Sequence, residues 1–260
     1  MPDSQIAEIT EKTTKLEDYW NQRDTVLKEE RERLNLVKPE PISGKIQWLI
    51  NEPKVFFDTA RALVSLNEPT FHLPISINYT PEQKQQMNKS ERLCIGIYRS
   101  LQYREAERGQ VDWLWNLAYW TLLGWYAVFT LVRKNEQTKQ IDFIADLWDP
   151  LTVYPEWDAD RLVTLIRTFE TDSITANAMA SNLSFQGSME SSFTEVGKGQ
   201  KAKIINYWKA QGSKIFNSVL IAGQVVKPLT EHKKLRRIPV HCGAIGAPDT
   251  FSPGWTERRG

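Results

Sequence analysis

The chain has 260 residues, enough for one large domain or two small ones. Its formal net charge of +1 excludes a general electrostatic attraction to nucleic acid or to an anionic membrane. Its two cysteines, Cys94 and Cys242, exclude a disulfide framework and are typical of a reducing compartment. The polar, charged N-terminus lacks the pattern of a signal peptide.

The first predicted element is a long, highly charged helix from about residue 6 to residue 36. A few apolar side chains fall roughly on one of its faces, and they are Leu16, Tyr19, Trp20, Leu27 and Leu34. Such a thin stripe is typical of a helix that docks on a larger body, although a solvated surface helix has the same pattern. We interpret residues 1–40 as a charged N-terminal helical arm and residues 41–260 as an α+β domain.

Two more helices are expected next along the chain. Pro53 suits the first turn of a helix that continues to about Leu66. The sequence Thr80-Pro81-Glu82-Gln83 is typical of a capping box, and it predicts a helix to about Glu105. Cys94 falls on the apolar face of that helix, together with Met87 and Leu101. We therefore interpret Cys94 as a core residue rather than a reactive thiol.

Residues 113–132 carry no formal charge, and they admit two interpretations. Their length matches a helix that crosses a bilayer. However, their four tryptophans are spread through the run rather than gathered at its ends, and β-type residues follow Gly124. We favour a buried helix at about 111–123, a break at Gly124, and a strand at 125–133.

After Gly124 the spacing of apolar residues changes from 3.6, which is typical of a helix, to 2, which is typical of a strand. Alternating segments near 141–148 and 162–170 predict strands, and a short helix is plausible at 173–179. Residues 181–200 are rich in Ser and Gly, which favours a flexible excursion. Three more strands are expected at 203–208, 215–221 and 225–227, with a tight turn at Gly223-Gln224, and Ile238-Pro239-Val240 forms a short extended piece. N-terminal helices followed by an antiparallel β meander predict an α+β fold.

The search for chemistry gives no catalytic, cofactor-binding or metal-binding residue. The three histidines are His72, His232 and His241, and the adjacent His241 and Cys242 lack zinc-ligand spacing. Asp142, Asp146 and Asp149 could cluster, but two of them alternate on one strand face, where solvation is the simpler account. We expect no cofactor and no enzymatic activity.

One basic run could contact phosphate groups. It consists of Lys227, His232, Lys233, Lys234, Arg236 and Arg237. The run contains no interleaved aromatic residue, so a solvated loop is the favoured interpretation.

The order of these segments resembles the N-terminal half of a tailed-bacteriophage portal protein, from about Tyr19 onward. The stretches that carry the resemblance are Tyr19-Trp20-Asn21-Gln22-Arg23-Asp24, Trp48 to Asn67, Leu117 to Val132 with Asp149-Pro150 and Val153 to Trp157, and Ile204 to Gly223 with Arg237-Ile238-Pro239-Val240. Each motif alone is weak, and their order is the more specific signal.

The resemblance implies a structural subunit of a homo-oligomeric ring, usually of twelve copies, at one capsid vertex of the virion. Double-stranded DNA would pass through that ring during packaging and ejection. Implied partners are the major capsid protein, the terminase large subunit and a head–tail adaptor, with assembly in the host cytoplasm and no membrane contact. The part present resembles the portal wing; stem, clip and crown would follow Gly260. Two alternatives stay open: a membrane-associated protein anchored by residues 113–132, and an enzyme with an unrecognised site.

Overall fold

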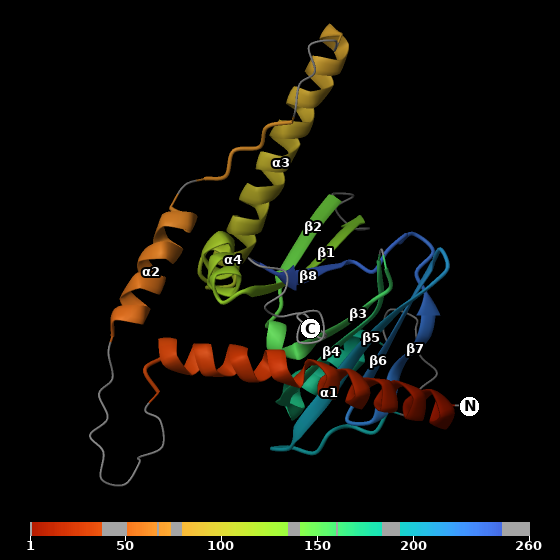
Figure 1. Ribbon diagram of the computed structural model, residues 1–260. Coiled ribbons are helices and arrows are strands. Elements are labelled where there is room, and N and C mark those ends of the chain that lie inside the picture. Colours follow the sequence, from red (N-terminus) through yellow and green to blue (C-terminus); the bar gives the residue numbers. More distant parts are fainter. Residues whose placement is uncertain are drawn as a thin grey trace, which may run out of the picture.

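Helices come first along the chain, and two antiparallel sheets follow them (Figure 1). The computed structural model describes residues 2–37, 51–66, 68–73, 80–134, 141–159, 161–183 and 193–245. The helices are α1 (Pro2–Leu34), α2 (Glu52–Ser65), α3 (Pro81–Glu107), α4 (Trp113–Leu122) and α5 (Ser173–Leu183). This arrangement confirms the predicted α+β class. The end of the predicted arm, residues 38–40, and much of the Ser-rich excursion lie outside the described residues.

The larger sheet is a five-stranded meander in which each strand pairs with the next one in sequence. Its strands are β3 (Val153–Trp157), β4 (Leu162–Asp172), β5 (Lys201–Gln211), β6 (Lys214–Ile221) and β7 (Gln224–Glu231). The turn between β6 and β7 lies at Ala222 and Gly223, both with positive φ, so it is one residue earlier than predicted. Two consecutive positive φ values are typical of the tight turns whose twist matches that of a hairpin.

The smaller sheet has three strands in the order β2-β1-β8. They are β1 (Trp125–Lys134), β2 (Ile141–Leu147) and β8 (Val240–Ala244). β8 returns from the end of the meander to pair with β1, with Trp125 opposite Ala244 and Phe129 opposite Val240. The chain thus closes the smaller sheet with its last described strand.

Helix α1 covers one face of the five-stranded sheet (Figure 1). Its buried apolar residues recur every four or seven positions, and they are Ile9, Leu16, Trp20, Leu27 and Leu34. They pack against sheet residues that include Ile166, Tyr207 and Leu220. Of the two predicted arrangements, the structure therefore shows the helix docked on a larger body, here the five-stranded sheet. Tyr19 is 56 % exposed, because a helix turns about 100° between neighbours and Trp20 occupies the sheet-facing position.

The opposite face of that sheet is covered by two elements. Helix α5 packs Ala176 and Ala180 over one end, and the smaller sheet packs Ala127 and Phe129 over the other. Helices α3 and α4 then cover the outer side of the smaller sheet, where Leu101 contacts the cluster around Val128. The molecule therefore has helices outside two stacked sheets.

The tryptophan-rich run folds as a short helix followed by a strand. Asp112 begins α4 by accepting hydrogen bonds from the N–H groups of Leu114 (2.7 Å) and Trp115 (3.1 Å). The helix ends before Gly124, whose φ of 99° suits glycine, and β1 begins at Trp125, which is 1 % exposed. The helix–glycine–strand interpretation is confirmed. Among the described residues, no helix combines the length and apolar character of a membrane span.

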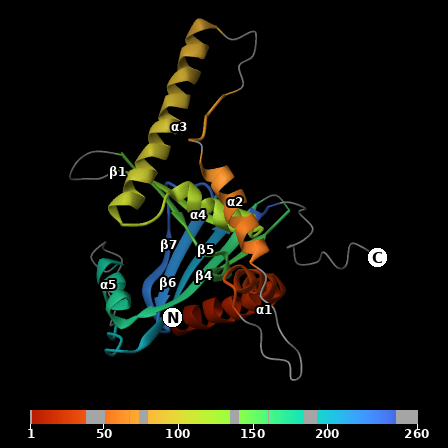
Figure 2. The same ribbon diagram turned by 90° about the vertical axis from the view of Figure 1, so that its left-hand side faces the viewer.

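Helices α2 and α3 are the least enclosed part of the molecule. α3 begins with the predicted capping box, in which Thr80 and Gln83 exchange hydrogen bonds of 2.9 and 3.3 Å. Its N-terminal part projects beyond the sheets, and α2 lies across α4 (Figures 1 and 2). Leu101 is the buried residue of α3, so interpreting Cys94 as core was wrong: it is half-buried on the projecting helix.

Candidate functional site

Two of the aspartates singled out in the sequence, Asp146 and Asp149, form ion pairs with different helices. Asp146 pairs with Arg104 and Arg108 of α3, and Asp149 pairs with Arg31 of α1 at 3.2 Å. Asp149 also accepts a hydrogen bond from the N–H of Leu151 (2.9 Å), which begins the short 3-10 turn Pro150–Thr152. Within the described part of the chain, no three His, Cys, Asp or Glu side chains are grouped as metal ligands would be.

A buried arginine fastens α1 to the rest of the molecule. Arg23 is 3 % exposed, and it donates to the carboxylate of its neighbour Asp24 (2.7 and 2.9 Å) and to the carbonyl of Val153 (3.0 Å). Its guanidinium lies 4.7 Å from the ring centroids of both Trp20 and Trp125. This cluster joins the helix, the junction after Gly124 and the larger sheet at one point.

Burial sets the electrostatics of this cluster. Desolvation raises the pKa of the Asp24 carboxyl, and the adjacent Arg23 opposes that shift. Desolvation also raises the pKa of the nearby Cys242 thiol to about 12, which keeps it protonated and unreactive at neutral pH. The Arg23 cluster is therefore a closed structural device rather than a ligand site.

A second arginine lies in a more open setting. The guanidinium of Arg167 stacks 4.4 Å from the centroid of Trp148 and 4.6 Å from that of Phe169. Burial lowers the pKa of Arg167 to about 10, against the opposing effect of Asp146. Its Nε has no hydrogen-bond partner among the described residues. Arg167 lines a cleft of about 490 Å³ together with Arg108, Trp113 and Trp120, among other residues.

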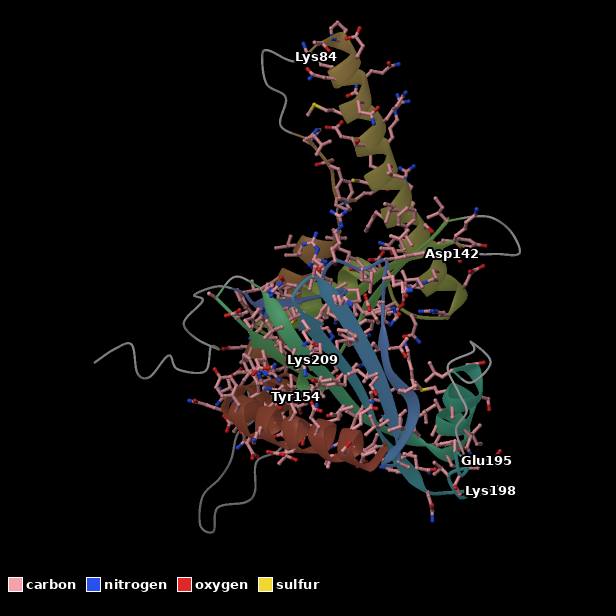
Figure 3. The ribbon with its side chains drawn as sticks, turned by 90° about the vertical axis from the view of Figure 1, so that its right-hand side faces the viewer. Lys84, Asp142, Tyr154, Glu195, Lys198 and Lys209 are labelled. Carbon is pink, nitrogen blue, oxygen red and sulfur yellow. The ribbon has the colours of Figure 1, made fainter. Side chains whose placement is uncertain are left out.

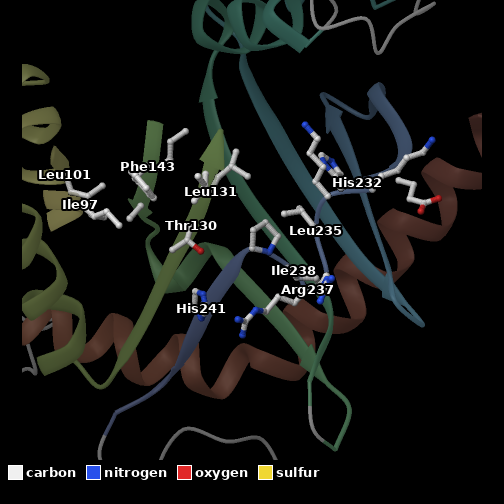
Figure 4. A pocket seen from close by; sticks show the side chains of 18 residues that line it. Ile97, Leu101, Thr130, Leu131, Phe143, His232, Leu235, Arg237, Ile238 and His241 are labelled. Atoms are coloured by element: carbon white, nitrogen blue, oxygen red, sulfur yellow. The ribbon is translucent and has the colours of Figure 1, made fainter. Parts of the chain in front are cut away.

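A groove of about 910 Å³ lies beside the connection from β7 to β8. Ile97 and Leu101 of α3 and Phe143 of β2 lie on one side of it, and His232, Leu235 and Arg237 lie on the other (Figure 4). Thr130 and Leu131 of β1 lie between the two sides. All members of the predicted basic run except Lys227 thus line one side of this groove.

Helix α2 presents an apolar stripe to solvent. Phe56, Leu63 and Leu66 are 77 %, 67 % and 74 % exposed, and their spacing places them on one helical face. The other side of α2 is held by α4: Phe57 packs edge-on against Tyr119, and Arg61 donates to the carbonyl of Trp115 (2.9 Å). The stripe is therefore held in a fixed orientation with nothing in the described residues covering it.

Helix α3 also carries exposed apolar side chains, since Leu93 is 56 % and Tyr103 68 % exposed. Figure 3 shows Lys84 at the far end of this helix, well away from the two sheets. A helix that projects in this way buries little apolar surface, so packing against the rest of the described residues adds little to its stability.

No protein-family model matches this sequence, and no curated protein matches it.

Proposed function

We propose that this chain is a structural, non-enzymatic subunit of a tailed-bacteriophage portal, contributing the wing of a homo-oligomeric ring at the capsid vertex. Double-stranded DNA would pass through the assembled ring during packaging and ejection. The major capsid protein, the terminase large subunit and a head–tail adaptor would be its partners. The ring would assemble in the host cytoplasm and become part of the virion.

The exposed apolar stripe of α2 is the observation that carries the proposal. A ring is built from heterologous contacts, in which one surface of each copy meets a different surface of the next. Phe56, Leu63 and Leu66 offer such a surface on a helix whose opposite face is already fixed against α4. Contiguous exposed apolar side chains on a soluble surface commonly mark a protein contact.

The projecting α3 supports the same proposal. Its exposed Leu93 and Tyr103 offer further apolar surface to a neighbouring copy. The choice of a portal as the assembly rests on the resemblance in segment order, from the Trp20 region to Ile238-Pro239-Val240.

The proposal is tested by the mass of the protein in solution. Light scattering after gel filtration, over a wide concentration range, should give species heavier than the 30.1 kDa chain. A strict monomer under all conditions contradicts the proposal.

A pair of double variants makes the test specific to α2. Phe56→Asp with Leu63→Asp should abolish the heavier species. Ile174→Asp with Leu229→Asp adds the same negative charge at two other exposed apolar positions, 76 % and 41 % exposed, and should leave the assembly intact. Equal loss in both double variants would contradict a contact through α2.

A further inference from the structure

The connection between β7 and β8 gathers cations that no described acidic residue pairs with. Lys233, Lys234, Arg236 and Arg237 are all exposed, and within the described residues none of them makes an ion pair. Elsewhere on the larger sheet some lysines are paired, as Lys203 is with Glu17 and Lys209 with Glu8. Because the whole chain has a formal net charge of only +1, this concentration of positive charge is local.

Two grooves flank this segment and share part of its wall. Arg236, Arg237, Ile238 and His241 line both the groove of about 910 Å³ and a narrower one of about 300 Å³. Glu231 is the acidic residue in the wall of the larger groove, and its carboxylate is already paired with Lys214 at 3.4 Å. The lining of the narrower groove contains no Asp or Glu and adds Arg161. We therefore expect a ligand of these two grooves to be negatively charged.

Aromatic side chains that the basic run itself lacks are supplied by other strands. Tyr126 of β1 and Trp157 of β3 line the narrower groove, beside Arg236 and Arg237. Trp157 is 44 % exposed, although its ring also contacts Trp20. The fold thus places aromatic surface next to unpaired guanidinium groups, a combination that the sequence pattern alone did not indicate.

We infer that this surface binds single-stranded nucleic acid. The phosphates lie along Lys233, Lys234, Arg236 and Arg237, and a base stacks in the narrower groove on Trp157 or Tyr126. An acidic peptide would use the cations but not the aromatic surface. In a duplex the bases are stacked on each other and do not reach such a groove. The inference goes beyond the proposed ring and does not depend on it, because one chain carries the whole surface.

The first test is fluorescence anisotropy with a labelled oligothymidylate of about 20 nucleotides. Binding should weaken with salt with a log–log slope of about −3, since each neutralised phosphate of a single strand contributes about −0.7 and four cations are available. A duplex of the same length should bind several-fold more weakly, and polyglutamate should compete poorly. Preference for the duplex, or full competition by polyglutamate, would overturn the inference.

Two charge-reversal variants locate the site. Arg236→Glu with Arg237→Glu should weaken binding by about tenfold or more and flatten the salt slope by about 1.4. Lys84→Glu with Lys89→Glu makes the same change in net charge at two exposed positions of α3 that form no ion pair with a described residue, and should leave binding nearly unchanged. Equal weakening by both double variants would show a non-specific charge effect and refute the site.

A third variant separates stacking from charge. Trp157→Leu should weaken binding several-fold while leaving the salt slope unchanged, because it removes a stacking surface and no cation. Circular dichroism would first establish that the variant is folded. A folded Trp157→Leu protein with unaltered affinity for the single strand would contradict the role given to the narrower groove, provided that Tyr126→Leu also has no effect.

Discussion

Helices α1 and α3 are both long, highly charged and thinly striped with apolar residues, yet only α1 buries its stripe. Five apolar residues of α1 are at most 9 % exposed, whereas on α3 only Leu101 is buried. The comparison shows that an apolar stripe on a helix predicts packing against a partner surface. It does not predict whether that surface belongs to the same chain. For α1 the partner is the sheet of the same chain. For α3 and for the stripe of α2, we propose that it is another subunit.

The largest expected effect is at the fastening point of α1. Arg23→Ala should lower the free energy of unfolding by about 3–5 kcal/mol, because it leaves the buried Asp24 carboxylate without its partner. Arg33→Ala removes an exposed ion pair with Glu30 on the same helix, and should cost about 0.5 kcal/mol or less. Urea denaturation of the two variants measures the difference. Similar costs would mean that the Arg23 cluster does not hold α1 in place.

The next effect contrasts two glycines. Gly124→Ala should destabilise by about 1–3 kcal/mol, because its φ of 99° is strained for any residue with a Cβ. Gly96→Ala lies within α3, where an added Cβ meets nothing within 4 Å, and should stabilise the helix by about 0.5–1 kcal/mol. Thermal melts should move in opposite directions. A neutral Gly124→Ala variant would contradict the helix-to-strand break that organises the core.

These contrasts also show how much the sequence could predict. The α4–Gly124–β1 junction, the capping box at Thr80 and strands β4 to β7 of the meander follow from local periodicity and turn chemistry, which act over a few residues. Strand β3 was not predicted. Cys94 was misplaced because α3 does carry an apolar face, but among the described residues only Leu101 of that helix is buried.

The features that sequence reasoning missed are those that join distant segments. The return of β8 to β1 spans more than a hundred residues and has no local signal. The Tyr126 and Trp157 wall beside the basic segment is likewise set only by the fold. For Arg23 a signal did exist: residues 20, 23 and 27 follow helical spacing, so an arginine lay on the apolar stripe. A charged residue at such a position predicts a buried, paired group.

A further effect, taken per pH unit, concerns pH and the core beneath α1. The pKa of Cys242 is raised to about 12 from 9, so between these values the unfolded chain has lost a proton that the folded chain keeps. The free energy of unfolding should therefore fall as pH rises through this window, by at most about 1.4 kcal/mol per pH unit from this group. Cys242→Ala should make the decline less steep. If the free energy of unfolding of Cys242→Ala, measured by urea denaturation, falls with pH as steeply as that of the parent protein, the thiol is not desolvated.

The smallest effect on stability is expected at the α2 stripe. Phe56→Asp with Leu63→Asp should change the free energy of unfolding of the monomer by no more than about 0.5 kcal/mol, because both side chains are already in water. Urea denaturation at low protein concentration measures this. A loss of several kcal/mol would show that the stripe packs inside its own chain, and would remove the contrast with α1.

The central claim is that the α2 stripe is a contact between copies, and sedimentation velocity at increasing protein concentration tests it most directly. The account predicts association beyond the monomer for the parent chain and for Ile174→Asp with Leu229→Asp, and a monomer at every concentration for Phe56→Asp with Leu63→Asp. Association that persists in the α2 double variant, or a parent chain that never associates, would contradict it.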